Sequence, residues 1–339
     1  MQQIWIPKEG APDVLEVRTA PDPDPQPGEV RVRVEASGLN FADLLGRMGV
    51  YPDRPPLPCV MGYEVAGTID AVGKGVDAAR IGQKIVGLTR FGGHSSVVCM
   101  PGIQAVERPD DMDAVTAASI PVTGLTAWMM IEVFGRVRKG DRVLVHSAGG
   151  GVGLACLDLL QRRGAYAIGT ASASKHAMLK ERGYDELIDY RNVDFAEALK
   201  DKPGLDLILD PIGGAYWDKG LGLLRAGGRI VCFGFSAAAQ SNQRSIVGTL
   251  STMWAVPWFK VNPIWLMNNN VGVMGVNMGH MWHEAERVSG WLEKLLALWQ
   301  QGKLRPQIHA TLPFSKVAEA HQLIHDRKNF GKVVLVPDP

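Results

Sequence analysis

The stretch from residue 141 to 169 constrains the fold more than any other part of this chain. Arg142–His146 is a short apolar run typical of a buried parallel strand, and a turn of small residues, Ala148–Gly153, follows it. Leucines at helical spacing then continue until Gly164, and a second apolar run begins at Ala165. Strand, glycine-rich turn, helix and strand together predict one βαβ unit, whose turn and helix N-terminus suit a pyrophosphate.

The turn carries the dinucleotide-binding fingerprint with alanine in place of the first glycine. Glycine-rich turns also occur in loops that bind nothing, but here the flanking strand, helix and second strand are all present, which favours a binding site. We therefore expect the cofactor phosphates to lie against the residues of the turn, which are Ala148, Gly150, Gly151, Val152 and Gly153.

The end of the second strand indicates which dinucleotide is bound. An NAD site places Asp or Glu about 20 residues after the turn, where it bonds the ribose 2′-hydroxyl. This chain offers Thr170-Ala-Ser-Ala-Ser-Lys175, which contains no carboxylate. The hydroxyl of Ser172 and the ammonium of Lys175 suit a 2′-phosphate, so NADPH is favoured. Alternatively Ser172 caps the next helix and Lys175 is solvated, and both interpretations can hold together.

Composition describes an ordinary globular protein of two domains. The 339 residues exceed a single typical core, and the chain is 46% hydrophobic and 21% charged. A net charge of +1 gives no electrostatic case for nucleic acid or an anionic membrane. Four scattered cysteines without C-x-x-C spacing fit free thiols in a reducing compartment, so we expect a cytoplasmic protein. The N-terminus does not resemble a signal peptide, and no apolar run is long enough to span a membrane.

The pattern of elements changes along the chain. Residues 1 to about 115 contain short strands and frequent glycines, which predict a small antiparallel barrel. From about Thr123 helices and strands alternate, which predicts a doubly wound parallel sheet. Expected elements there include a helix at Trp217–Leu224, a strand at Gly228–Gly234 and a last edge strand at Val271–Met278. The tail has the mixed character of the first region, so the domains are predicted as 1–121 with 280–339, and 122–279.

Several segments resemble motifs of a known superfamily: Ser37–Asp43, Val143–Gly153, Gly169–Lys175, Asp210–Gly214 and Asn329–Pro337. They are similar to the medium-chain dehydrogenases/reductases, and specifically to the zinc-free quinone oxidoreductases related to zeta-crystallin. Gly169–Lys175, Ile188–Tyr190 and Leu295–Leu298 resemble in particular the vesicle amine transport protein homologue branch. The resemblance covers essentially the whole chain. It implies an α/β fold in which a Rossmann sheet is inserted into a β-rich, alcohol-dehydrogenase-like catalytic domain.

The chain departs from the zinc alcohol dehydrogenases of this superfamily at their metal ligands. Where those enzymes use Cys, His and Cys, this chain has Asn40, Tyr63 and, near the third position, Ser119. None of these is a good zinc ligand, and the four-cysteine structural zinc lobe is absent too. Two histidine pairs occur at helical spacing, His280/His283 and His321/His325. Neither has a nearby third ligand, so we interpret them as surface histidines and expect no metal.

Without a metal, the resemblance implies hydride transfer from NADPH to a quinone or to an electron-poor C=C bond. Negative charge then develops on the conjugated oxygen, which needs a hydrogen-bond donor and a proton. Asn40 stands at the former metal position, where its amide can donate; alternatively it stabilises a turn before a helix. Tyr51 lies where related enoyl-thioester reductases place a proton-donating tyrosine, or it is a loop-packing aromatic. Thr123 resembles a family contact to the nicotinamide side.

The resemblance also assigns cofactor contacts outside the glycine-rich turn. They are Tyr190 beside the adenosine phosphate, Gly234 and Phe235 after a Rossmann strand, and Lys332 in the terminal Gly-Lys near the cofactor mouth.

Aromatic residues are concentrated in one segment, residues 253–267. We interpret it first as a homodimer contact or pocket wall, and less readily as a site of peripheral membrane association, because only Lys260 supplies positive charge there. The expected protein is thus a homodimeric, zinc-independent NADPH oxidoreductase acting on quinones or α,β-unsaturated carbonyls. The alternatives are an enoyl-thioester reductase, for which no basic cluster for coenzyme A phosphates is evident, and a cofactor-binding protein that acts by binding lipid, membrane or a partner.

Overall fold

The computed structural model describes residues 1–236 and 261–339. The chain divides into two compact units: the first unit is Met1–Leu125 with Met278–Pro339, and the second unit is Thr126–Asn277. The second unit is thus an insertion into the first. The predicted boundary after residue 121 lies at the start of helix α3 (Pro121–Trp128), which runs across the division.

The first unit is built on a seven-stranded sheet in the order β14-β15-β3-β4-β5-β7, with β6 paired to β3. Its strands are β3 (Glu29–Leu39), β4 (Glu64–Val72), β5 (Lys84–Leu88), β6 (Val97–Pro101), β7 (Ala105–Glu107), β14 (Ile308–Pro313) and β15 (Lys332–Val336). All pairings are antiparallel except β14 with β15. The parallel pair lies in the tail, outside the residues for which antiparallel strands were predicted, and helix α11 (Val317–His325) connects its two strands as a crossover.

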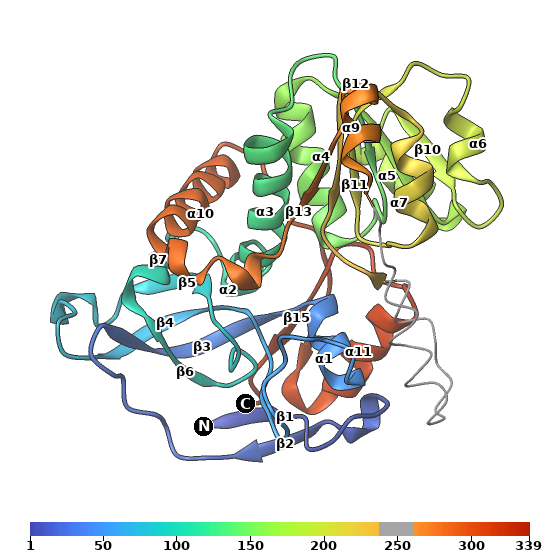
Figure 1. The fold of residues 1–339 in the computed structure, drawn as a ribbon. Coiled ribbons are helices and arrows are strands. Elements are labelled where there is room, and N and C mark those ends of the chain that lie inside the picture. The colour runs from blue at the N-terminus through green and yellow to red at the C-terminus, as the bar shows by residue number, and fades with distance from the viewer. Residues whose placement is uncertain (237–260) are drawn as a thin grey trace. The chain divides into compact units, whose positions relative to one another are not determined.

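Helices and a separate hairpin complete the first unit. The helices besides α11 are α1 (Phe41–Met48), α2 (Ala114–Ala118) and α10 (Ala285–Gln300), and the hairpin joins β1 (Gln2–Trp5) to β2 (Glu16–Thr19). The two termini lie close together (Figure 1), and the Asp338 backbone N–H donates to the Gln2 side chain at 3.0 Å. One core cluster fills the sheet around Val32, Ile69 and Ile85, and another lies where Leu44, Phe314 and Val333 meet.

The second unit contains a six-stranded parallel sheet in the order β10-β9-β8-β11-β12-β13. Its strands are β8 (Arg142–Val145), β9 (Tyr166–Ala171), β10 (Glu186–Asp189), β11 (Leu205–Asp210), β12 (Leu224–Cys232) and β13 (Gly272–Gly275). The chain runs outward from β8 in both directions, which confirms the predicted doubly wound Rossmann sheet. Because parallel crossovers are right-handed, helices on the two arms cover opposite faces (Figure 1).

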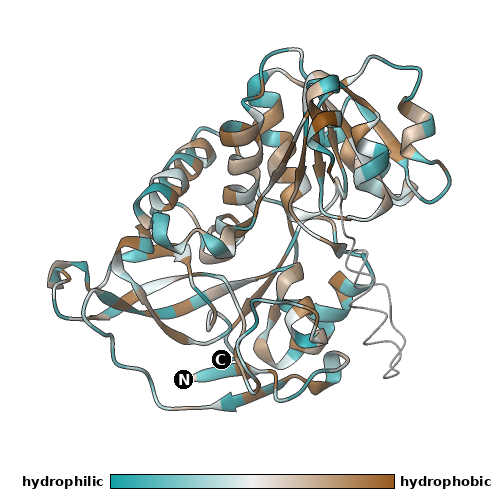
Figure 2. Ribbon diagram, in the orientation of Figure 1, coloured by the Kyte–Doolittle hydropathy of each residue, from teal (hydrophilic) through white to brown (hydrophobic). Residues whose placement is uncertain are grey.

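The helices of the second unit pack on strands whose central residues are mostly apolar and buried. They are α4 (Gly151–Arg163), α5 (His176–Arg182), α6 (Phe195–Leu199), α7 (Ala215–Leu221) and α9 (Pro263–Asn269), with a π-helical segment at Met129–Gly135. Phe195 of α6 and Trp217 of α7 pack against Leu144, Ile168 and Ile208 of the sheet. Figure 2 shows the brown, hydrophobic colour concentrated along these central strands.

Three boundaries in the second unit differ from the sequence-based expectations. Helix α7 ends at Leu221, and Leu224 already belongs to β12, where it pairs with Leu205 of β11. The predicted helix is too long because Leu223 and Leu224 continue its apolar spacing. In the structure both leucines pack against the core cluster of the sheet. The last strand is shorter than predicted and covers only Gly272–Gly275.

One predicted surface histidine is buried. His321 lies on α11 with 2% of its surface exposed, because this helix packs against the core around Phe314 and Ala320. Burial lowers the pKa of its imidazole to about 3, so it is neutral at physiological pH. The interpretation of His321 as a solvated residue is therefore wrong.

The aromatic-rich segment is described only in part. Residues 253–260 lie outside the described residues, whereas Pro263–Met267 form most of α9. Ile264 and Met267 of α9 are 66% and 73% exposed, so this short helix presents apolar side chains to solvent. Among the described helices, none combines the length and the apolar character needed to cross a bilayer.

Candidate functional site

Asn40 lies between the end of β3 and the start of α1, and its side chain is held by the protein on both sides. The amide Nδ2 donates to Glu64 Oε1 at 2.8 Å and to the Gly38 carbonyl at 3.3 Å. The carbonyl Oδ1 accepts from Lys332 Nζ at 2.5 Å. Asn40 is also the N-cap residue of α1 and shares a capping box with Asp43, so the interpretation as a residue that stabilises the helix start stays open. Both of its amide hydrogens already have acceptors. The longer bond to Gly38 is the weaker of the two.

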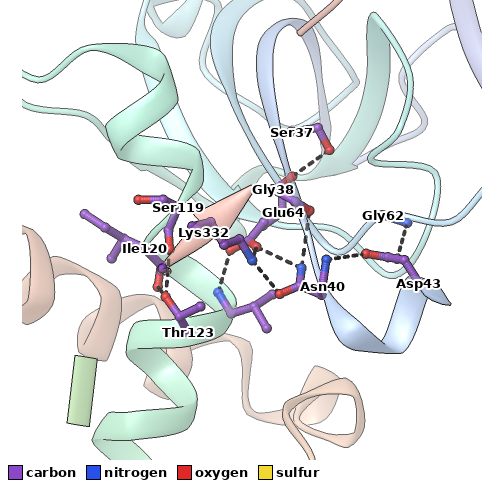
Figure 3. A network of polar contacts seen from close by, with 12 residues as sticks. Ser37, Gly38, Asn40, Asp43, Gly62, Glu64, Ser119, Ile120, Thr123 and Lys332 are labelled. Carbon is purple, nitrogen blue, oxygen red and sulfur yellow. Dashed lines mark hydrogen bonds and ion pairs between the residues drawn. The ribbon is translucent and has the colours of Figure 1, made fainter. Parts of the chain in front are cut away.

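Glu64 is the centre of this polar network (Figure 3). It opens β4, is fully buried, and accepts from Asn40, from Lys332 Nζ at 2.6 Å and from the Val122 backbone N–H at 2.7 Å. Gly38 allows this approach: a Cβ there would collide with the Glu64 carboxylate and lie 2.6 Å from the Ala118 carbonyl oxygen. The strand pairing of β3 with β4 and of β3 with β15 brings these residues together.

Lys332 supplies the positive charge of the network. It is the first residue of β15 and only 5% exposed, and its ammonium contacts Glu64 and Asn40. A buried carboxylate and ammonium offset each other's desolvation only when both are well hydrogen-bonded, and here both are. Sequence reasoning assigned Lys332 to the cofactor and Asn40 to the reaction; the structure brings these two residues into direct contact.

A second buried network lies beside the first, centred on Asp43 of α1. Its carboxylate accepts from the Asn40 N–H at 2.8 Å and from the Gly62 N–H at 3.1 Å, and His94 Nε2 lies 3.4 Å away. Burial alone would raise the pKa of Asp43, but His94 and the backbone donors outweigh it and hold the pKa below its usual value. Ser37 Oγ lies 2.9 Å from His94 Nδ1, whereas the buried His94 Nε2 has no hydrogen-bond partner and only this longer contact with Asp43.

Thr123 is buried in α3, where its hydroxyl donates to the Ser119 carbonyl at 2.7 Å. Ser119, near the third former zinc-ligand position, donates in turn to the Thr116 carbonyl at 2.6 Å. Both hydroxyl protons are therefore donated to carbonyls of the preceding backbone turn. Each oxygen can still accept a hydrogen bond, so a role for Thr123 toward the nicotinamide stays a prediction.

Tyr51 and Tyr63 form a hydrogen-bonded pair at the start of a proline-rich loop. Tyr63 OH donates to Tyr51 OH at 3.0 Å, and the rings meet edge-on with centroids 6.3 Å apart. Burial raises the pKa of Tyr51, and the carboxylate of Asp53 raises it further. The pKa of Tyr63 is raised as well, by burial and by its hydrogen bond to Tyr51. Tyr51 is thus a protonated phenol at neutral pH, and Val122 packs against the same hydrophobic cluster as Tyr51 does.

In the second unit, the glycine-rich turn joins β8 to α4 with the geometry of a phosphate-binding turn. Gly150 precedes the helix without a side-chain cap, so the first helical N–H groups of Gly151 and Val152 face no capping side chain. A Cβ at Gly153 would lie 2.6 Å from the Ala148 carbonyl oxygen, so only glycine permits this close packing. Ala148 itself is buried, and its N–H donates to the Thr170 carbonyl at 3.1 Å.

The other predicted cofactor residues lie at the same edge of the parallel sheet, because each follows the carboxyl end of a strand. Ser172 and Lys175 follow β9, Tyr190 follows β10, and Gly234 and Phe235 follow β12. Ser172 Oγ lies 3.0 Å from Ser174 Oγ and does not bond the backbone as a helix cap. A Cβ at Gly234 would lie 2.9 Å from the Pro211 carbonyl oxygen, so this turn also requires glycine.

Sequence reasoning missed Glu64 and the neighbours of Tyr51. The signal for Glu64 was a carboxylate directly before the apolar strand run Val65–Ala66, a position that is costly to bury without a partner. Asp53 and His280 were also missed as a pair: His280 Nε2 lies 2.8 Å from Asp53 Oδ2 across 227 residues of sequence. Within the described ranges 1–236 and 261–339, no three His, Cys, Asp or Glu side chains gather in a way that could hold a metal ion.

Comparison with known proteins identifies the family. Residues 26–110 match the alcohol dehydrogenase GroES-like domain, and residues 182–335 match the family described as zinc-binding dehydrogenase. The synaptic vesicle membrane protein VAT-1 homolog of Rattus norvegicus is 40% identical over 311 residues, which cover 91% of this chain and 76% of that protein. The chain belongs to the VAT-1 homologue branch of the medium-chain dehydrogenase/reductase superfamily.

Solved structures agree with this membership. Human VAT-1 homolog-like protein superposes with a TM-score of 0.85 at 31% identity, covering 100% of this chain and 98% of that one. Escherichia coli quinone oxidoreductase, solved in complex with NADPH, gives a TM-score of 0.87 at 26% identity over 99% and 100% of the two chains. The predicted superfamily, branch and two-domain fold class are therefore confirmed, and the chain is an oxidoreductase of the medium-chain type.

The Glu64–Lys332 pair leads to a prediction for stability. Lys332→Met leaves the Glu64 carboxylate buried without its cation, so we expect the free energy of unfolding to fall by about 3–5 kcal/mol. Denaturant unfolding measures this loss. Lys303→Met, at an exposed lysine, is the control and should change stability by less than about 0.5 kcal/mol. The double variant Lys332→Met/Glu64→Gln should recover part of the loss; equal stability of Lys332→Met and Lys303→Met would contradict the role given to the pair.

Proposed function

We propose that this chain is a zinc-independent, NADPH-dependent oxidoreductase that reduces quinones or α,β-unsaturated carbonyls by hydride transfer. The observation that carries the proposal is the Asn40–Glu64–Lys332 network at the former metal position. The side-chain oxygens of Asn40 and Glu64 accept hydrogen bonds from the Lys332 ammonium and from N–H groups. Tyr63, at the second ligand position, donates a hydrogen bond to Tyr51. Such a donor set is built for hydrogen bonding and is not one that zinc prefers.

The second unit fits NADPH. The uncapped start of α4 after Gly150 suits the pyrophosphate, and the close packing at Gly153 keeps the turn narrow. Ser172 and Lys175 would hold the 2′-phosphate, since the six residues from Thr170 contain no carboxylate to bond a free 2′-hydroxyl. Tyr190, Gly234 and Phe235 complete the expected contacts. Escherichia coli quinone oxidoreductase, whose solved complex contains NADPH, supports this choice of cofactor.

NADPH, when bound, supplies the hydride. Hydride addition to the β-carbon of an enone moves the π electrons to the carbonyl oxygen, and this enolate oxygen then takes a proton. Tyr51 is the residue we assign to that step, because its oxygen already accepts from Tyr63 and its own proton is retained at neutral pH. Asn40 is assigned a positioning role, since both hydrogens of its amide already have acceptors in the protein.

Turnover of an acceptor panel tests this function directly. We expect NADPH oxidation with quinones and enones, and weaker activity with enoyl thioesters. Tyr51→Phe removes the proton but keeps the ring, so kcat with an enone should fall by about 10²-fold or more. Phe91→Leu, in the same aromatic cluster, is the packing control and should change kcat far less. The proposal fails if no acceptor is turned over although NADPH binds.

The cofactor preference has its own test. Ser172→Asp places a carboxylate at the end of β9, where it repels a 2′-phosphate and can bond a ribose 2′-hydroxyl. We expect the ratio of kcat/KM for NADPH over NADH to fall by about tenfold or more, equivalent to about 1.4 kcal/mol. Ser174→Ala serves as the neighbouring control. An unchanged ratio in Ser172→Asp would contradict the assignment of Ser172 to the 2′-phosphate.

A second candidate is that the chain acts mainly by binding lipid, a membrane or a partner protein. The exposed apolar side chains of α9 favour it, and relatives carry the name of a vesicle membrane protein. Co-sedimentation with liposomes, with and without NADPH, separates the two candidates, because the enzyme proposal expects no binding. We further propose a cytoplasmic homodimer, on the basis of the unpaired cysteines and of the aromatic-rich segment. Enoyl-thioester reduction remains the alternative chemistry, with no basic cluster in the sequence to support it.

A further inference from the structure

We propose that the second unit binds a small organic phosphate in a cavity lined by arginines, at the edge of the sheet where its strands begin. The glycine-rich turn and the other proposed cofactor residues of this unit follow the opposite, carboxyl ends of the strands, so the cavity is separate from the proposed NADPH site. The inference goes beyond the proposed function, because it does not depend on which acceptor the protein reduces.

The cavity has a volume of about 510 Å³, which is within the usual range for small-molecule sites. Its walls include residues around the first positions of three strands. Asp141 directly precedes β8, and Asp206 is the second residue of β11. Arg225 and Arg229 lie in the first part of β12. Because these strands run parallel, their first residues meet at one edge of the sheet.

A bulge in β12 shapes one wall of the cavity. Leu205 of β11 pairs with Leu224 of β12. Leu207, two positions further along β11, pairs with Arg229, so the intervening residues of β12 leave the ladder of hydrogen bonds. Arg225 is one of these residues and lines the cavity. Bulges redirect side chains in this way beside functional sites.

The cavity carries an excess of positive charge, and its arginines are Arg136, Arg138, Arg225 and Arg229. Within the described ranges, only Arg225 among them lies at ion-pair distance from a carboxylate, and its partners are Asp206 and Asp141. Residues 237–260, which lie outside those ranges, contain no Asp or Glu. Three guanidinium groups at this cavity therefore lack an acidic partner. The arginines come from two segments far apart in the sequence, so no basic run reveals the site.

The two aspartates of the cavity have other donors. Asp206 accepts from the Arg142 backbone N–H at 2.9 Å as well as from the Arg225 side chain. Asp141 accepts from the Arg138 backbone N–H at 2.9 Å, which stabilises the turn before β8. The two carboxylates thus leave the other three guanidinium charges unbalanced.

A solvated surface explains this arrangement less well than a binding site does. Arg229 Nη1 donates to the Gly227 carbonyl at 3.0 Å, but its Nε is buried without a partner. A buried donor left unpaired is costly, and like charges around one cavity repel each other. An anion in the cavity offsets both costs.

The chemistry of the walls indicates the class of anion. A guanidinium group matches phosphate oxygens with two parallel hydrogen bonds, and a phosphate has enough oxygens and charge for several such groups. Val133, Phe134 and Met274 line the same cavity with half-buried apolar side chains, which suit an apolar body attached to the phosphate. A net charge of +1 for the chain does not favour nucleic acid as the ligand.

Calorimetric titration with naphthyl phosphate tests the site, with NADPH present at saturation so that the cofactor's own phosphate-binding groups are occupied. We expect one molecule bound per chain. Inorganic phosphate should bind about tenfold more weakly or less, because it has no apolar body to bury against Val133, Phe134 and Met274.

The variant Arg136→Asn/Arg138→Gln removes two of the unpaired guanidinium groups, so the affinity for naphthyl phosphate should fall about tenfold or more. Both side chains are exposed, and asparagine tolerates the left-handed backbone of residue 136, where φ is 43°. Lys139→Gln/Lys180→Gln is the matched control, since it removes two charges from exposed lysines of the same unit that do not line the cavity. Unchanged NADPH affinity and unfolding temperature show that both variants are folded.

The other outcomes overturn the proposal. They are no binding of naphthyl phosphate to the wild type, an undiminished affinity in the arginine variant, and an equal loss in the lysine control. Inorganic phosphate that binds as tightly as naphthyl phosphate overturns the assigned class of ligand. Vesicles of phosphatidylcholine and phosphatidylglycerol that bind through these arginines, while naphthyl phosphate does not bind, assign them to a membrane surface instead. Turnover of quinones and enones is measured separately, so the failure of this site leaves the proposed function intact.

Discussion

The buried pairing of Glu64 with Lys332 is the interaction on which the polar site of the first unit depends (Figure 3). A carboxylate at this depth is tolerated only with a counter-charge and hydrogen-bond donors, and it receives both from segments far apart in the sequence. The pair therefore ties together β3, β4, β15 and the start of α3. It also fixes Asn40, whose amide orientation follows from a donor on one side and an acceptor on the other. Stability and the shape of the site thus have one physical cause.

The second unit achieves its arrangement differently, by topology. Six strands run parallel, so the segments that follow them meet at one edge whatever their side chains are. The chemical properties of the edge then depend on a few residues within those segments. Gly153 and Gly234 keep the backbone close-packed, and Ser172 and Lys175 supply polar groups where many relatives of this fold have an acid. The sheet edge is therefore a common feature of this fold, and a few residues along it affect which cofactor is preferred.

This contrast explains what the sequence could predict. The βαβ unit and its turn depend on neighbours in the chain, so their strand, glycine and helix signals are all local and the Rossmann sheet was predicted correctly. The contact between Asn40 and Lys332 joins residues separated by 292 positions, and no periodicity encodes it. The burial of His321 was missed for a similar reason. The sequence pattern of its helix indicates the apolar face, but it does not indicate that a polar residue on that face is covered by a second element. The end of α7 was missed because leucines fit a helix and a buried strand equally.

The ammonium of Lys332 also bears on which residue could act as the acid. Lys332 directs two of its three N–H donors to Asn40 and Glu64, so its charge mainly balances the buried carboxylate. Thr123 donates its proton to the Ser119 carbonyl, and Asp43 accepts from two backbone N–H groups. Tyr51 differs from these residues, because its oxygen accepts a hydrogen bond from Tyr63 and its raised pKa keeps its own proton in place at neutral pH. This difference in hydrogen bonding, more than the identity of any single residue, is the reason for proposing Tyr51 as the acid in place of Lys332 or Thr123.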